Sequence, residues 1–133
     1  GVAANDVVVQ EELKATLLIN PRPTGEAFTA YSFPSKNLEY MASGTPVLTT
    51  RLSGMPREYD AYAYLFTDES VEGMAKTLVE VLAQPREALH ARGQAAKAFV
   101  LEQKSNTAQA KRLLAFLQSL ESPENTPRGE ATT

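Results

Sequence analysis

Short apolar runs alternate with helical patterns in the first 80 residues, and proline or glycine bounds each run. Residues 17–20 (LLIN) are stopped by the Pro-Arg-Pro of 21–23, and 47–50 (VLTT) follow the Gly-Thr-Pro of 44–46. A third run, 62–66, is rich in tyrosine and suits an edge strand. Buried parallel strands read as such runs because helices cover both faces of their sheet. We therefore predict an α/β fold, a short parallel sheet of a partial Rossmann-like domain flanked by helices, with a helical C-terminal part.

Two helices are expected among these runs. Asn5 and Asp6 can cap a helix over 7–15, and Ser32 can cap a second helix with Pro34 in its first turn. Gly44 ends that second helix.

Three further helical patterns follow, beginning at Ser70, at Pro85 and near Asn106. Their expected apolar faces are, in order, Val71, Met74, Ala75, Leu78 and Leu82; Leu89, Ala96, Phe99 and Val100; and Ala110, Leu113, Leu114, Leu117 and Leu120. The segment 121–133 is polar and contains proline, so we predict a disordered tail there.

Length and composition limit the class of protein. The 133 residues fit one domain, over 1–120, but three strands are fewer than the about five or six of a nucleotide-binding α/β domain. The chain also begins with glycine, so we expect the C-terminal part of such a domain. A net charge of −3 with mixed signs argues against nucleic acid as a partner. With no cysteine and one histidine, His90, no metal site is expected.

No apolar run approaches the roughly 18 to 20 residues of a membrane span. The start of the chain also lacks the layout of a signal peptide. These features predict a soluble, cytoplasmic protein.

The helix start near Ser32 is the candidate binding site. A helix that follows a strand and a loop directs free N–H groups and about half a positive charge toward the carboxyl edge of the sheet, which suits a phosphate. Ser35 and Glu39 share a flank, and Lys36 precedes Glu39 by three residues, so all three can line one crevice. The carboxylate can accept ribose hydroxyls and the ammonium can approach a diphosphate. The alternative is a solvated Lys36–Glu39 pair with Pro34 as a helix starter.

Two segments, INPRP (19–23) and YSFPSKNLEYMASGTPVLTTRLSGMPREY (31–59), resemble the C-terminal donor-binding domain of retaining GT-B glycosyltransferases of the group 1, or family 4, type. That family carries two glutamates separated by seven residues, and the pattern around the second matches 39–47. The resemblance gives Glu39 the role of ribose-binding carboxylate. The first glutamate is replaced by Tyr31, which departs from the pattern.

A subgroup of the family has Phe-Pro-Ser-Lys before the glutamate, as this chain has at 33–36. This match makes Pro34, Ser35 and Lys36 candidate donor contacts. Glu26, in the preceding loop, is the candidate substitute for the missing first glutamate. No catalytic residue is identified.

The resemblance implies a parent enzyme that transfers a sugar from a nucleotide-diphosphate sugar in polysaccharide or glycoconjugate synthesis, peripheral to the inner membrane face if it meets a membrane at all. It implies no metal or other cofactor. The acceptor-binding N-terminal domain, an expected partner, is not in this sequence, so the isolated chain should be inactive. The alternative is a non-catalytic α/β interaction module. Self-association through the exposed surface of the last helix is a further expectation.

Other conspicuous residues have simpler explanations. The Ser-Gly-Met-Pro of 53–56 can place backbone amides beside a ligand, but is most often turn chemistry. His90 is expected to be structural or exposed, because no acid or nucleophile stands at catalytic spacing from it. Tyr59, Tyr62 and Tyr64 are expected to pack at the sheet edge.

Overall fold

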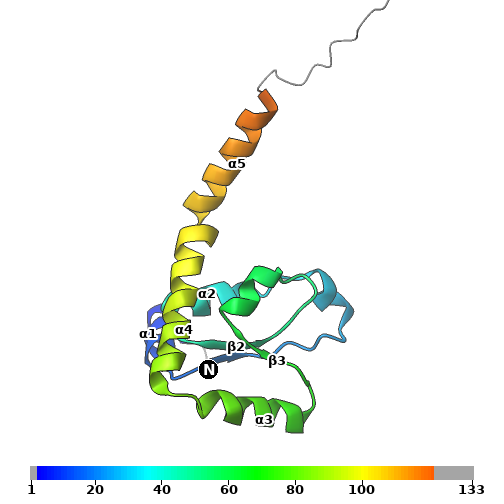
Figure 1. Ribbon diagram of the computed structural model, residues 1–133, viewed down its shortest axis with the longest axis vertical. Coiled ribbons are helices and arrows are strands. Elements are labelled where there is room, and N and C mark those ends of the chain that lie inside the picture. Colours follow the sequence, from blue (N-terminus) through cyan, green and yellow to red (C-terminus); the bar gives the residue numbers. More distant parts are fainter. Residues whose placement is uncertain (1–2, 122–133) are drawn as a thin grey trace, which may run out of the picture.

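A three-stranded parallel sheet is the centre of the computed structural model, which describes residues 3–121 (Figure 1). The strands are β1 (Leu18–Asn20), β2 (Val47–Thr50) and β3 (Tyr64–Phe66), and they lie side by side in the order β1-β2-β3. Leu18 aligns with Val47, and Leu48 with Tyr64. Every residue of the central strand β2 is buried, and β3 is an edge strand of this sheet, as predicted. The predicted fold class, a Rossmann-like α/β unit with a helical C-terminal part, is confirmed.

Helices flank this sheet and follow it. The α-helices are α1 (Asn5–Lys14), α2 (Ser35–Ser43), α3 (Val71–Leu82), α4 (Arg86–Phe99) and α5 (Asn106–Glu121). Two 3₁₀ turns, η1 (Ala27–Tyr31) and η2 (Arg57–Ala61), and one π-helical turn, η3 (Val100–Lys104), complete the chain. Helix α2 packs on β1 and β2, α4 packs on α2, and α3 packs against β3. Figure 1 shows α2 and α3 on opposite sides of the sheet.

Aromatic side chains connect the segment before α2, the η2 turn and α4 in the hydrophobic core. The ring of Tyr59 lies 5.1 Å from that of Phe33 and 5.2 Å from that of Phe99, between ring centroids. Tyr62 stacks on Phe99 at 4.3 Å. Tyr59 and Tyr62 therefore pack against the rings of Phe33 and Phe99, whereas Tyr64 lies on the edge strand β3 as predicted. The predicted inward residues of α4 and its C-terminal end are all buried: Leu89, Ala96, Phe99 and Val100.

Two glycines allow α4 to cross the end of α2 at close range. Gly44 ends α2 as predicted, with φ of 84°, a left-handed conformation that favours glycine. A Cβ atom on Gly93 would lie 2.2 Å from the carbonyl oxygen of Gly44 and 2.9 Å from the nitrogen of Pro46. The backbones of α4 and of the turn before β2 therefore meet without a side chain between them.

The predicted side-chain caps of the first two helices are wrong. Helix α1 has Ala4 as its N-cap, so Asn5 and Asp6 lie inside its first turn. Helix α2 has Pro34 as its N-cap and begins at Ser35, whereas Ser32 ends the preceding 3₁₀ turn. This turn was not predicted, and it delays the start of α2 beyond Ser32.

The predicted inward face of α3 is also partly wrong. Val71 and Leu82 are 79% and 47% exposed, whereas Val81 is buried. Ala75 is exposed too, while Met74 and Leu78 are half-buried as expected. Because α3 carries apolar residues on more than one side, spacing alone does not select the face. Its contact with β3 selects the residues around Val81.

Helix α5 projects away from the sheet (Figure 1). Ser105 is extended, with φ of −62° and ψ of 153°, and its Oγ accepts a hydrogen bond of 3.2 Å from the backbone N–H of Ala108. The predicted apolar seam is exposed along its length, at Ala110, Leu113, Leu114, Leu117 and Leu120. Apart from Glu121, which ends α5, the predicted disordered tail lies outside the described residues. Among the helices of 3–121, none is long and apolar enough to cross a membrane.

Candidate functional site

A polar network centred on Asn37 joins α2 to the carboxyl ends of β1 and β2. The Nδ2 of Asn20 donates to the Oδ1 of Asn37 at 2.7 Å, and the Nδ2 of Asn37 donates to the Oγ1 of Thr49 at 3.1 Å. The Thr49 hydroxyl donates in turn to the carbonyl oxygen of Asn20 at 2.8 Å. Asn37 and Thr49 are fully buried. The network therefore fixes the first turn of α2 over the carboxyl edge of the sheet.

The first turn of α2 lacks a side-chain cap. Its N-cap is the buried Pro34, whose carbonyl oxygen accepts from the N–H of Asn37 at 2.8 Å. The amides of Ser35 and Lys36 precede this bond, at the end of the helix where the dipole favours an anion. The side chain of Ser35 is exposed beside them.

Lys36 and Glu39 form an ion pair on this turn. The Nζ of Lys36 lies 2.8 Å from the Oε1 of Glu39, and both side chains are partly exposed. The same ammonium lies 3.6 Å from the Oε1 of Glu12, a buried carboxylate on α1. The hydrogen bond to Glu39 raises the pKa of Lys36 above its ordinary value. One cation thus faces two carboxylates, and the excess negative charge suits hydroxyl donors better than it suits phosphate.

Glu26 stands apart from this group. It is exposed at the start of η1, where its carbonyl oxygen accepts from the N–H of Thr29 at 3.0 Å. Within residues 3–121 its carboxylate has no hydrogen bond or ion pair. Tyr31, at the position of the missing family glutamate, is 95% exposed. The structure therefore brings Pro34, Ser35, Lys36 and Glu39 together on one turn, and leaves Glu26 on a neighbouring loop.

Glu69 connects the segment after β3 to the loop after β1 through hydrogen bonds. Its carboxylate accepts hydrogen bonds from the backbone N–H of Thr24, at 3.1 Å, and from the Thr24 hydroxyl. The side-chain bond from Thr24 is the main cause that lowers the pKa of Glu69. Arg22 N–H donates to the Oγ1 of Thr50 at 3.0 Å. A cavity of about 200 Å³ opens here, lined by Pro21, Arg22, Pro23, Thr50, Glu69 and Met74.

The sequence analysis did not predict either the hydrogen-bond network of Asn37 or the hydrogen bonds between Thr24 and Glu69. Asn37 lies four residues before Met41 and so shares its inward face, a signal that a buried polar side chain occupies the helix start. The sequence carries no comparable signal for Glu12, Thr24 or Glu69, since their partners come from other elements.

The remaining candidates are accounted for by packing. The N–H of Met55 donates to the carbonyl oxygen of Leu52 at 3.0 Å, which makes 53–56 a turn. A Cβ on Gly54 would lie 3.0 Å from the carbonyl oxygen of Ser32, so this turn packs on the chain before α2. His90 is exposed on α4, as predicted. Between residues 3 and 121, no cluster of three or more metal-ligating side chains is found.

Parallel strands, a crossover helix and a helix start placed over their carboxyl ends define a Rossmann-like α/β unit. A family model described as glycosyl transferase-like matches residues 9–115. This match covers most of the chain, so the protein belongs to the glycosyl transferase-like family, and the resemblance read from the sequence is confirmed. Neither a curated protein nor a solved structure matches the chain.

Proposed function

We propose that this chain is the donor-binding portion of a retaining glycosyltransferase that transfers a sugar in polysaccharide or glycoconjugate synthesis. The family membership supports a sugar donor as substrate. The observation that carries the proposal is the first turn of α2, which Asn37 holds over the carboxyl edge without a side-chain cap. Ligands of open α/β sheets bind outside this edge.

The charges on α2 favour a division of roles. Glu39 accepts hydrogen bonds from the ribose hydroxyls of a nucleotide-diphosphate sugar. Because Glu39 and Glu12 already face the ammonium of Lys36, the diphosphate is met mainly by the amides of Ser35 and Lys36, with Pro34 setting the start of the turn. Glu26 contributes to the sugar hydroxyls from its exposed loop.

The proposal extends to a longer parent enzyme. An acceptor-binding N-terminal domain completes the cleft, and the chain alone is inactive. The proposed location of the parent enzyme is the cytoplasm, with peripheral attachment to the inner face of the membrane.

The test is a Glu39→Ala substitution in the full-length parent. We expect donor affinity to fall ten- to a hundredfold, since the ribose loses a charge-assisted partner worth about 1.5 to 3 kcal/mol. Isothermal titration with the nucleotide-sugar and steady-state kinetics measure this loss. The matched control is Glu11→Ala, which removes a glutamate from another exposed i, i+3 pair, with Lys14 at 2.9 Å. Equal donor affinity in both variants contradicts the assignment of Glu39.

The isolated chain separates this proposal from the non-catalytic interaction module. Titration with a nucleoside diphosphate should change the amide chemical shifts of 32–39 first, because those amides lie nearest the proposed site. If the chain is instead a non-catalytic interaction module, we expect no localised change in these chemical shifts. Loss of the response in Ser35→Pro, which removes one first-turn N–H at a position that tolerates proline, would strengthen the assignment.

Self-association through α5 is part of the same proposal. Leu113, Phe116, Leu117 and Leu120 are each at least 46% exposed at helical spacing, a pattern typical of a helix that packs on another helix. We expect a concentration-dependent dimer of the isolated chain in sedimentation experiments, and a monomer for Leu113→Ser with Leu117→Ser. A wild-type chain that stays monomeric at all concentrations contradicts it.

A further inference from the structure

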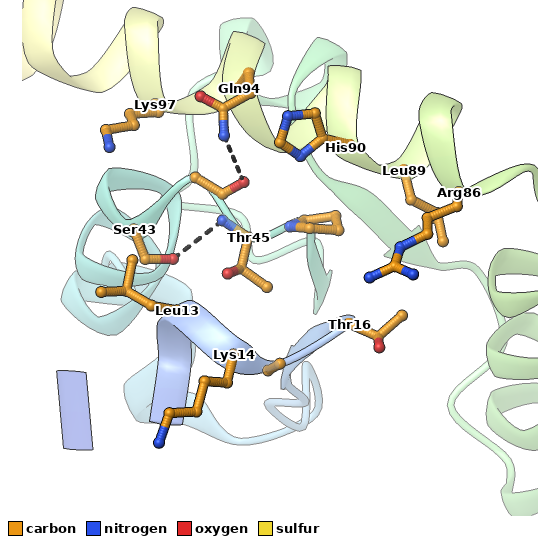
Figure 2. Close-up of a pocket in the computed structure, with 13 residues that line it drawn as sticks. Leu13, Lys14, Thr16, Ser43, Thr45, Arg86, Leu89, His90, Gln94 and Lys97 are labelled. Carbon is orange, nitrogen blue, oxygen red and sulfur yellow. Dashed lines mark hydrogen bonds between the residues drawn. The ribbon is translucent and has the colours of Figure 1, made fainter. Parts of the chain in front are cut away.

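A second cavity, of about 420 Å³, lies at the opposite edge of the sheet from the proposed donor site (Figure 2). It is bounded by the end of α1, the segments before β1 and β2, and α4. Its size falls within the range of small-molecule pockets, roughly 300 to 1,000 Å³. This cavity therefore lies at the amino edge of the sheet and is distinct from the proposed donor site at the carboxyl edge.

The lining of this cavity is basic, although the whole chain has a net charge of −3. Lys14, Arg86, His90 and Lys97 contribute to it, and no aspartate or glutamate does. Lys14 already pairs with Glu11 at 2.9 Å, and Figure 2 shows its ammonium directed away from Arg86. The remaining basic groups all belong to α4.

Arg86, His90, Gln94 and Lys97 form one polar ridge along α4, at spacings of four, four and three residues. Residues at these spacings share a helix face. In Figure 2, the guanidinium of Arg86 and the ring of His90 face the cavity, with Thr16 on the other side. The ridge spans about 16 Å from Arg86 to Lys97, at about 1.5 Å of rise per residue.

The basic side chains of this ridge lack partners. The side chains of Arg86, His90 and Lys97 form no hydrogen bond or ion pair with any residue of 3–121, while Gln94 Nε2 donates to the carbonyl oxygen of Gly44 at 3.5 Å. A structural explanation is that cations offset the negative ends of α1 and α2. That explanation accounts for Lys97, which also lies in the last turn of its own helix. It does not account for Arg86, the first residue of α4, where the dipole of its own helix disfavours a cation.

We propose that this cavity binds an elongated small anion that carries at least two phosphate groups. Arg86 holds one phosphate with its fork of N–H donors, assisted by the Thr16 hydroxyl. Lys97, whose ammonium points away from Arg86 in Figure 2, turns toward the cavity to meet the second phosphate as a point charge. His90 and Gln94 lie between them. The site acts at the amino edge of the sheet and is independent of donor binding at α2.

The test is titration of the 133-residue chain with inorganic triphosphate and, separately, with orthophosphate at fixed ionic strength. We expect saturable amide shifts at 13–16, 43–45 and 86–97 in NMR spectra, with triphosphate binding more tightly. Arg86→Gln should weaken triphosphate binding about tenfold or more. Lys97→Gln should remove most of the preference for triphosphate over orthophosphate.

The matched control is Lys111→Gln with Arg112→Gln, two exposed cations on α5, which should leave binding unchanged. All variants should retain the wild-type urea midpoint, since Arg86 and Lys97 have no partner to lose among the described residues. No saturable response at the cavity, or a response confined to 34–39, would overturn the proposal.

A lipid headgroup presents the same phosphate chemistry, so a second arm measures co-sedimentation with phosphatidylglycerol vesicles. We expect no binding that depends on Arg86. Vesicle binding that Arg86→Gln abolishes, without a response to triphosphate, would overturn the small-molecule assignment and place a membrane lipid at the cavity.

Discussion

The two edges of the sheet are built by different means. At the carboxyl edge, polar side chains satisfy one another: Asn20, Asn37 and Thr49 form one network, and Thr24 is bonded to Glu69. At the amino edge, backbone meets backbone at Gly44 and Gly93, and the nearby cations on α4 lack partners. The comparison separates polar groups that position the chain from polar groups that remain available to a ligand.

The largest expected effect tests the backbone packing at the amino edge. Gly93→Ala should lower the free energy of unfolding by about 3 kcal/mol, because the new Cβ would lie 2.2 Å from the Gly44 carbonyl oxygen. Urea denaturation measures the change. The control is Gly25→Ala, where a Cβ would have no neighbour within 4 Å. If both variants have a similar free energy of unfolding, the close contact between Gly93 and Gly44 does not determine the packing at the amino edge.

A smaller effect tests the hydrogen-bond network at the carboxyl edge. Asn37→Ala should cost about 2 kcal/mol of unfolding free energy, because it leaves the buried polar groups of Asn20 and Thr49 without their partner. Gln10→Ala, an exposed change on α1, should cost less than about 0.5 kcal/mol. If Asn37→Ala is as mild as this control, the network does not position α2.

The smallest effect concerns the bond between Thr24 and Glu69. The pKa of Glu69 is lowered in the folded protein, so its contribution to stability is present above its ordinary pKa and disappears as pH falls through the lower folded value. The NMR titration of its carboxylate should have a midpoint below the ordinary pKa of a glutamate side chain. Thr24→Ala should raise the midpoint. An unchanged midpoint in that variant would remove Thr24 as the cause.

Local patterns predicted the elements better than the faces that they bury. The run of 47–50 became β2, and Gly44 ended α2, because a short run of β-branched and apolar residues after a Gly-Thr-Pro turn and a left-handed glycine leave few alternatives. The face of α3 was missed, since apolar residues surround that helix and only its contact with β3 decides which of them are buried. The apolar face of α5 was predicted from its spacing, but residue spacing does not show whether that face is buried against another element.

The candidate site was predicted in part for the same reason. The pairing of Lys36 with Glu39 follows from their spacing on one helix. Glu12 lies beside Lys36 only because α1 packs on α2. The charge balance around Glu39, which decides what it can bind, therefore depends on a tertiary contact that the sequence does not encode locally.

Ser105 gives α5 a starting point of its own. Ser105 is one extended residue between the π-helical turn and a capped helix of 16 residues. Its two backbone dihedral angles therefore determine the direction of a helix about 24 Å long. A rotation of about 10° at Ser105 would carry the tip of α5 through on the order of 4 Å, as follows from that rise per residue. A small substitution at this joint can therefore re-aim the apolar surface of α5 while the sheet and both of its edges stay as they are.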